Sequence, residues 1–304
     1  SSGSPLIKRN NINLIIGIHI GGKDTESFDN NNNFNIATAF DVIIKDIKDQ
    51  MSTIDLIYEK SKDNDSNNNI FGEEFVNNNK ENIILKINDI DSELIGKYNL
   101  KEGINNIQII IKNKLTNLKD MFYKVTSLKN IEKLKCLNTK NVKDFSNMFY
   151  GCSSLSDIKA LENWNVSKGN NFECMFYGCS LLKDIKSLEN WNVSNGQYFS
   201  NMFSYCSSLS DIKPIQNWNV SNGQYFSAMF SGCKSLSDIN SLQNWNVSNG
   251  LFFSGMFSYC SSLSDIKAIK NWNVSKGKDF SGIFYECSLL SNIDKLLNWN
   301  VSLD

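Results

Sequence analysis

Arginine, histidine and proline are almost absent from this sequence. Among 304 residues there are one arginine (Arg9), one histidine (His19) and two prolines, and the formal net charge is −1. Arginine is the residue that best recognises phosphate groups, so a nearly neutral chain with one arginine is a poor nucleic-acid binder. No apolar run approaches the roughly 18 residues that a membrane-spanning helix needs. We therefore predict neither nucleic acid as a partner nor membrane insertion by these residues.

The single histidine also limits the chemistry that the chain can perform. A cysteine–histidine nucleophile would have to use His19, which lies in a strand-like pattern far from the cysteine-rich part of the sequence. The segment GIHIGGKD at 17–24 approaches a phosphate-binding loop, but Asp24 stands where the loop needs a hydroxyl and would repel phosphate. We predict a strand ending in a Gly-Gly turn there, no catalytic residue and no cofactor.

The dominant feature of the sequence is a repeat of 27 residues. All the tryptophans keep this step: Trp164, Trp191, Trp218, Trp245, Trp272 and Trp299. Six of the eight cysteines keep it too: Cys152, Cys179, Cys206, Cys233, Cys260 and Cys287. A degenerate unit fits the same register, so we predict seven coils that begin at residues 118, 145, 172, 199, 226, 253 and 280. One such unit cannot bury its own apolar side, so the coils are expected to stack.

Each coil is predicted to hold one short helix and one short strand. Four apolar residues at i, i+3, i+4 and i+7 indicate the helix: Phe199, Met202, Phe203 and Cys206. The strand is placed near Ile212, where apolar residues recur at three-residue steps. Gly223 is expected to form a turn with positive φ.

These repeats resemble a known family. MFYGCSSLSDI at 148–158, MFSYCSSLSDI at 202–212 and 256–266, and LNTKNVKDFSNMFYGCSSL at 137–155 are similar to BspA-like leucine-rich repeats of Mycoplasma surface lipoproteins and of protists such as Entamoeba. IFGEEFVNNNK at 70–80 is similar to a segment that often precedes such repeats. The resemblance implies a leucine-rich-repeat-like solenoid with a parallel sheet, mostly non-enzymatic and often adhesive at the cell surface. This sequence departs from the family in its 27-residue period and in the glycine inserted after the Asn-Val-Ser serine.

The predicted domain organisation has three parts. Residues 1–5 resemble the remnant of an expression tag, so the native N-terminus and its targeting signal are expected to be missing. Residues 6–117 are predicted to form an α+β N-terminal cap, and residues 118–304 the seven-coil solenoid. Within the cap we predict strands at 12–20, 53–60, 82–89 and 106–113, a helix at 36–51 and a short helix at 72–79.

Several repeated columns have a structural explanation as well as a functional one. The cysteines could form disulfides or bind metal, but a buried ladder of small apolar side chains explains them better; the only close pair is Cys174 and Cys179. Columns of aspartate and lysine, beginning with Asp157 and Lys159, could bind calcium but are explained as mutually neutralising surface charges. We predict no metal site.

The Asn-Val-Ser sequences, from Asn165 to Asn300, are formal glycosylation acceptors in six coils. Glycans on adjacent coils about 4.8 Å apart would collide. We therefore predict a ladder of amides that satisfies backbone groups between coils. Outside the repeats, Asn64 is a more accessible acceptor and is our candidate glycosylation site.

The best candidate for a binding site lies where the coils differ. The position before the first buried phenylalanine carries Tyr198, Tyr225 and Phe252 in three consecutive coils. The flanking coils have Asn171 and Asp279 there, which a core column would not tolerate, so we expect the column to be partly exposed. Residues one position earlier complete the predicted site: Gln197, Gln224 and Leu251. A short aromatic stripe bordered by polar groups suits a protein or glycan contact, although stacking alone would also explain it.

The functional prediction is a non-catalytic repeat module that binds a protein or glycan, in a cell-surface or secreted adhesin-type protein. One alternative is a cytoplasmic leucine-rich-repeat scaffold with reduced cysteines. Another is an enzymatic or nucleotide-binding activity in the N-terminal region. The last coil ends with Ile293, Leu296 and Trp299 and no visible cap, so we also expect either continuation of the native chain or end-to-end association through this coil.

Overall fold

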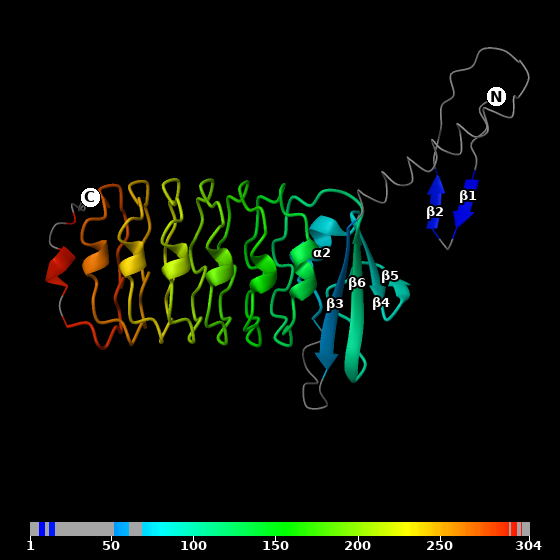
Figure 1. Cartoon of the computed structure of the whole chain (residues 1–304), viewed down its shortest axis with the longest axis horizontal. Coiled ribbons are helices and arrows are strands. Elements are labelled where there is room, and N and C mark those ends of the chain that lie inside the picture. Colours follow the sequence, from blue (N-terminus) through cyan, green and yellow to red (C-terminus); the bar gives the residue numbers. More distant parts are fainter. Residues whose placement is uncertain are drawn as a thin grey trace, which may run out of the picture. The chain divides into compact units, whose positions relative to one another are not determined.

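The computed structural model describes residues 6–9, 12–15, 52–60, 69–291, 293–296 and 299. The chain divides into two compact units, Ser1–Lys48 and Asp49–Asp304. In the first unit the described segments are β1 (Leu6–Arg9) and β2 (Ile12–Ile15), which pair in antiparallel fashion (Figure 1). The strand predicted over 12–20 is present in its described part, and the helix predicted over 36–51 lies outside the described residues.

The second unit starts with a four-stranded antiparallel sheet in the order β3-β6-β4-β5. The strands are β3 (Ser52–Lys60), β4 (Ile83–Ile87), β5 (Ile90–Ser92) and β6 (Gly103–Ile111). Buried residues alternate along β4 and β6, and the directly paired Leu85 and Ile109 are both fully buried. The alternating patterns at 53–60, 82–89 and 106–113 therefore located three of these strands.

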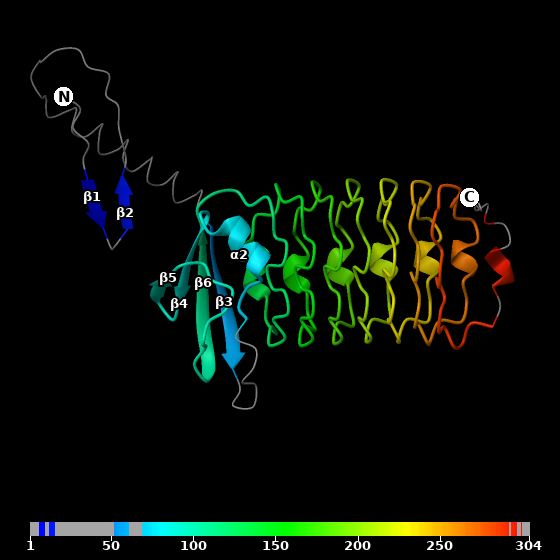
Figure 2. The same cartoon turned by 180° about the vertical axis from the view of Figure 1, so that it is seen from behind.

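The short helix α2 (Glu73–Asn79) and the residues before it lie against the first coil (Figure 2). The Phe71 ring is 6.0 Å from that of Phe122, the first of a column of stacked phenylalanines. The Gly72 N–H donates to the Asp120 carbonyl at 3.1 Å, and a Cβ at Gly72 would lie 2.3 Å from that oxygen. Only glycine permits this approach, which covers the apolar end of the first coil.

Neighbouring coils are joined by a ladder of backbone hydrogen bonds that repeats from one coil to the next. Single parallel bridges link Asn117, Asp144, Asn171, Tyr198, Tyr225, Phe252 and Asp279 in succession. From there alternate N–H groups donate to the next coil: Phe199 to Tyr225, Asn201 to Ser227, Phe203 to Met229 and Tyr205 to Ser231. The N–H groups of Met202, Ser204 and Cys206 close tight turns within their own coil, to the carbonyls of Phe199, Asn201 and Phe203.

Two columns of left-handed residues make these turns. The first holds Asp120, Asn147, Cys174, Asn201, Ala228, Gly255 and Gly282. The second holds Lys124, Gly151, Gly178, Tyr205, Gly232, Tyr259 and Glu286. Each is the third residue of a four-residue turn closed by an i+3 N–H, as Asn201 is between Phe199 and Met202, and positive φ at that position is typical of type II turns.

Opposite the ladder, each coil carries a 3₁₀ helix. These are η1 (Glu132–Cys136), η2 (Lys159–Leu161), η3 (Lys186–Leu188), η4 (Lys213–Ile215), η5 (Asn240–Leu242), η6 (Lys267–Ile269) and η7 (Asp294–Leu296). The aspartate column starts them: the Lys213 N–H donates to Asp211 Oδ1 at 2.7 Å, and the neighbouring coils repeat this bond. These aspartates therefore have a backbone role that charge neutralisation does not describe.

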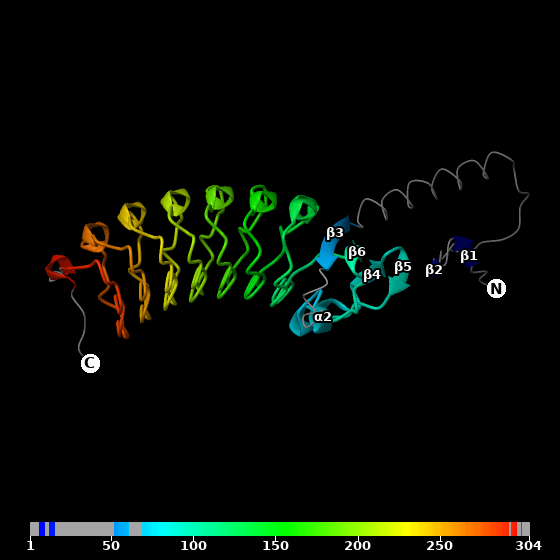
Figure 3. The ribbon, with the colours of Figure 1, turned by 90° about the horizontal axis from the view of Figure 1, so that it is seen from below.

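Stacked ring columns fill the space between ladder and helices, and their spacing shows that the stack bends. Ring centroids are 4.8 Å apart for Tyr198 and Tyr225, 5.6 Å for Phe199 and Phe226, and 6.5 Å for Trp191 and Trp218. The coils are thus closer on the tyrosine side, and the 3₁₀ helices lie on the outer side of the bend (Figure 3). Each tryptophan Nε1–H also donates across coils, Trp218 to the Leu188 carbonyl at 3.0 Å.

The predicted leucine-rich-repeat-like solenoid, with a strand plus a helix per coil and a parallel sheet, is wrong. In the part of the chain that the structure describes, the only sheet of the second unit is the antiparallel one, and the coils hold single bridges, turns and 3₁₀ helices. The segment predicted as a helix, 199–206, is the ladder, because Asn201 and Tyr205 have left-handed backbones that an α-helix cannot contain. Ile212, predicted in a strand, is the residue that precedes η4.

Gly223 was expected to need positive φ, and this is also wrong. A Cβ there would lie 2.3 Å from Cζ of Phe226 and 3.0 Å from the Val220 carbonyl. The inserted glycine is therefore required by the phenylalanine ring that packs on it. Gly169, Gly196, Gly250 and Gly277 have the same contact.

Candidate functional site

The predicted site residues Tyr198, Tyr225 and Phe252 form one continuous stack, here called the aromatic stripe. All three are half-buried and stand at the bridge positions of the ladder. Their rings are nearly parallel, with centroids 4.8 Å and 5.3 Å apart. The ring faces therefore cover one another, and the ring edges and tyrosine hydroxyl groups are what a partner could reach.

A groove of about 340 Å³, here called the amide groove, adjoins the stripe. It is lined by Gln197, Asn222, Gln224, Asn249, Leu251 and Lys276. The structure therefore brings together in one hollow the three flanking residues predicted from sequence, because each precedes a stripe residue in its coil. Five of the six side chains are uncharged, and the sixth, the Lys276 ammonium, donates to Asn249 Oδ1 at 2.7 Å.

A second row of tyrosines was missed by sequence reasoning. Tyr123, Tyr150 and Tyr177 stack with centroids 4.8 Å and 4.5 Å apart. Tyr205 continues the row edge-to-face at 5.3 Å, and a Cβ at Gly232 would lie 2.8 Å from the Tyr205 ring. Tyr205 stands one position later in its coil than the other three tyrosines, so comparison of equivalent positions at exact 27-residue steps does not include it in the row.

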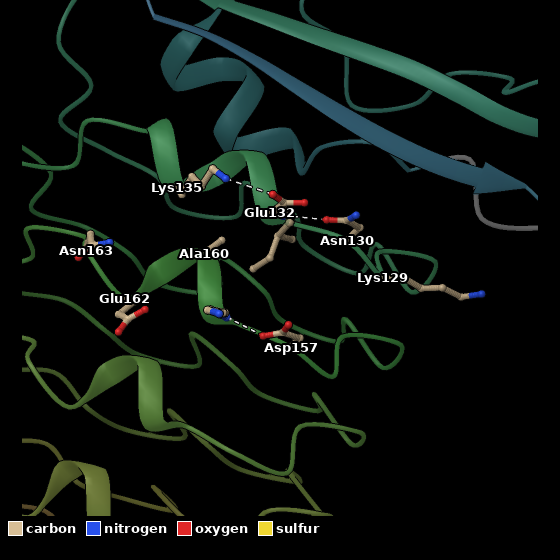
Figure 4. Close-up of a pocket in the computed structure, with 10 residues that line it drawn as sticks. Lys129, Asn130, Glu132, Lys135, Asp157, Ala160, Glu162 and Asn163 are labelled. Carbon is tan, nitrogen blue, oxygen red and sulfur yellow. Dashed lines mark hydrogen bonds and ion pairs between the residues drawn. The ribbon is translucent and has the colours of Figure 1, made fainter.

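A cavity of about 610 Å³, larger than the amide groove, lies on the outer side of the bend between η1 and η2 (Figure 4). Lys135 Nζ is 3.1 Å from Glu132 Oε1 at its rim, and Asp157 Oδ1 accepts the Lys159 N–H. Its lysines and acidic residues balance in charge, three of each: Lys129, Lys135, Lys159, Glu132, Asp157 and Glu162. Because the stack bends, neighbouring coils are farther apart on the side of the 3₁₀ helices. Smaller grooves between η3 and η4 and between η4 and η5 have the same origin, so this cavity is explained by the bend.

The cysteine column is a buried ladder of free thiols, as predicted. Cys206 Sγ lies 3.2 Å from the Phe176 carbonyl and Cys233 Sγ the same distance from that of Phe203, and the other coils repeat the contact. Burial raises the pKa of the Cys260 thiol to about 12. These thiols are therefore protonated and poorly nucleophilic. Cys174 is half-buried and burial raises its pKa to about 12, while Cys136 is exposed.

The asparagine prediction is partly wrong. The Asn-Val-Ser asparagines that the structure describes, from Asn165 to Asn273, are exposed and bond within their own turn: Asn219 Oδ1 accepts the Ser221 N–H at 3.1 Å. The amide ladder between coils is instead formed three residues later, where Asn222 Nδ2 donates to the Ser194 carbonyl at 2.7 Å. Both positions are asparagine, so spacing alone did not distinguish them.

Three sequence-predicted features lie outside the described residues: His19, the segment 17–24 and the glycosylation candidate Asn64. Across the described ranges, no three histidine, cysteine, aspartate or glutamate side chains gather as a metal site would require. Across the same ranges, no helix combines the length and apolar character needed to cross a bilayer.

The family assignment rests on one comparison. A protein-family profile described as "Mycoplasma protein of unknown function, DUF285" matches residues 92–212 and 206–303, which include every coil. Neither the curated proteins nor the solved structures contain a significant match to this chain. Because the two matched segments cover most of its length, the chain belongs to the DUF285 family of Mycoplasma proteins of unknown function.

Proposed function

We propose that this chain is a non-catalytic binding module and that its ligand contacts the aromatic stripe and the amide groove. The observation that carries the proposal is the position of Gln197, Gln224 and Leu251 in one groove beside stacked aromatic residues. The scaffold residues of the coils are nearly the same from coil to coil, whereas these positions vary along the stack. Variation on a constant scaffold supports recognition of a specific partner.

The geometry favours a protein ligand over a glycan. Sugars bind aromatic side chains mainly by stacking on an exposed ring face, and the stripe rings cover one another with interplanar angles of 12° and 13°. The exposed tyrosine edges and the amide groups of the groove instead suit hydrogen bonds and apolar contacts at a protein interface. A glycan therefore remains the alternative outcome of the binding test.

The resemblance to BspA-like repeats supports a place for this module in an adhesin-type protein at the cell surface or outside the cell. The DUF285 match is compatible with this and carries no functional description of its own. The alternative is a cytoplasmic scaffold, and the protonated, unpaired thiols of the cysteine column are compatible with it. Localisation of the full-length protein by surface biotinylation separates the two.

The test starts with a panel of cell-surface proteins and a glycan array, both probed with the whole chain. For any ligand found, Tyr198→Ala with Tyr225→Ala should weaken binding at least about tenfold, or about 1.4 kcal/mol. The matched control is Tyr150→Ala with Tyr177→Ala, a second stacked pair outside the groove. Equal loss of binding in both double variants, or none in the first, would refute the stripe as the contact surface.

A further inference from the structure

Three consecutive coils carry an asparagine directly before glycine in the turn that follows the tryptophan. The pairs are Asn195–Gly196, Asn222–Gly223 and Asn249–Gly250. Because glycine has no Cβ, its backbone nitrogen meets little hindrance when it approaches the preceding side-chain amide. Asn–Gly is therefore the sequence in which asparagine modifies itself most readily.

The reaction needs only water. In the first pair, the Gly196 backbone nitrogen loses its proton and attacks Cγ of Asn195, so that an N–Cγ bond forms. The Cγ–Nδ2 bond breaks, and the amide nitrogen leaves as ammonia with the proton released by the backbone. Water then opens the resulting succinimide at either carbonyl and leaves aspartate or isoaspartate.

The stacked coils restrain both reacting groups. Asn195 Nδ2 donates to the Ser167 carbonyl of the preceding coil at 2.7 Å, and the Gly196 N–H donates to the Val193 carbonyl at 2.8 Å. The other two pairs repeat both bonds. We infer that the three Asn–Gly pairs are self-modification sites controlled by the fold, protected while the coils are stacked and reactive when a coil separates from its neighbour.

Modification would also prevent the coil from closing again. An aspartate in place of Asn195 puts a carboxylate where an amide donor now lies 2.7 Å from a carbonyl oxygen. Isoaspartate adds a carbon to the main chain in a turn where a Cβ on Gly196 would already lie 2.4 Å from Phe199. Since Asn222 and Asn249 line the amide groove, the groove would gain negative charge as well.

The three sites should differ in a defined order. Asn195 and Asn222 are exposed, whereas Asn249 is half-buried and its Oδ1 also accepts the Lys276 ammonium at 2.7 Å. Asn249 therefore has both ends of its amide held, and we expect it to react most slowly. Lys276 is exposed, so Lys276→Ala can release Asn249 without disturbing the core.

The experiment is peptide mapping by mass spectrometry after incubation of the whole chain at mildly alkaline pH, native and in guanidinium chloride. Modification of the three asparagines should be at least about tenfold slower in the native protein than in guanidinium chloride, because only the small population of molecules with a separated coil can react. In the native protein Asn249 should be slowest, and Lys276→Ala should raise its rate to that of Asn222 while Asn195 is unchanged. Equal rates in native and unfolded protein would overturn the inference.

A second pair of variants tests control by local opening. Phe199 and Phe253 pack on Gly196 and Gly250 in the same way. Phe199→Ala should accelerate Asn195 more than Asn249, and Phe253→Ala should do the reverse. The same change in rate at all three sites in both variants would contradict opening of individual coils.

Discussion

The left-handed columns make a prediction that depends on backbone conformation alone. Ala228 has φ of 53°, and the equivalent residue in the next coil is Gly255 with φ of 59°. A left-handed residue with a Cβ destabilises the folded state by about 1–2 kcal/mol, and glycine removes that strain. Glycine also gives the unfolded chain more conformational freedom, which offsets about 0.4–1 kcal/mol of the gain. Ala228→Gly should therefore raise the free energy of unfolding by about 0.5–1 kcal/mol.

The reverse change should have the opposite sign. A Cβ at Gly255 would lie 3.2 Å from Ser258 Oγ, which needs only a small shift, so Gly255→Ala should lower the free energy of unfolding by about the same 0.5–1 kcal/mol. The control is Ala268→Gly in η6, a right-handed helical position, where glycine should destabilise by about 1 kcal/mol.

The assay is urea unfolding followed by tryptophan fluorescence, with midpoints compared at unchanged m-value. The two single variants Ala228→Gly and Ala268→Gly should then shift the urea midpoint in opposite directions, the first upwards and the second downwards. If Ala228→Gly destabilises the protein as Ala268→Gly does, the type II-like turns of the ladder are wrong.

Four further predictions concern the coils. Gly223→Ala should destabilise by about 1–3 kcal/mol, since its Cβ would lie 2.3 Å from Phe226 Cζ; an unchanged melting temperature would contradict this packing. Trp218→Phe removes one of the two donors to the Leu188 carbonyl, which keeps the Trp191 N–H at 3.1 Å. The loss should cost about 0.5–1.5 kcal/mol in chemical denaturation, and a neutral result would mean that the tryptophan bond does not stabilise the stack. Native alkylation should modify Cys136 and spare Cys206 and Cys233, whose thiol pKa burial raises; mass spectrometry of labelled peptides decides this. Burial raises the pKa of the Cys260 thiol to about 12 in the folded protein, whereas the unfolded thiol loses its proton near pH 8.5. The contribution of this thiol to the free energy of unfolding should therefore be complete below about pH 8.5 and should fall as the pH rises towards 12. A flat profile of unfolding free energy against pH would count against the buried ladder.

Comparison of equivalent positions in successive coils predicted one part of the candidate site and could not predict the rest. The bridge column was identified because Asn171 and Asp279 could not occupy a core position, and its half-buried exposure agrees with that reasoning. The amide groove and the parallel arrangement of the ring faces depend on the spacing and direction of neighbouring coils, which no single coil specifies. The second tyrosine row requires in addition the register shift at Tyr205.

The sequence by itself determined which residues are buried, because apolar side chains recur at 27-residue steps and alternate along strands such as β4 and β6. It did not determine the backbone that carries them. Spacing of i, i+3, i+4 and i+7 is shared by an α-helix and by consecutive tight turns whose every fourth residue is left-handed. The choice between them was made by hydrogen bonds to residues 26 positions away in the next coil, such as Phe199 to Tyr225, and these exist only once the coils are stacked.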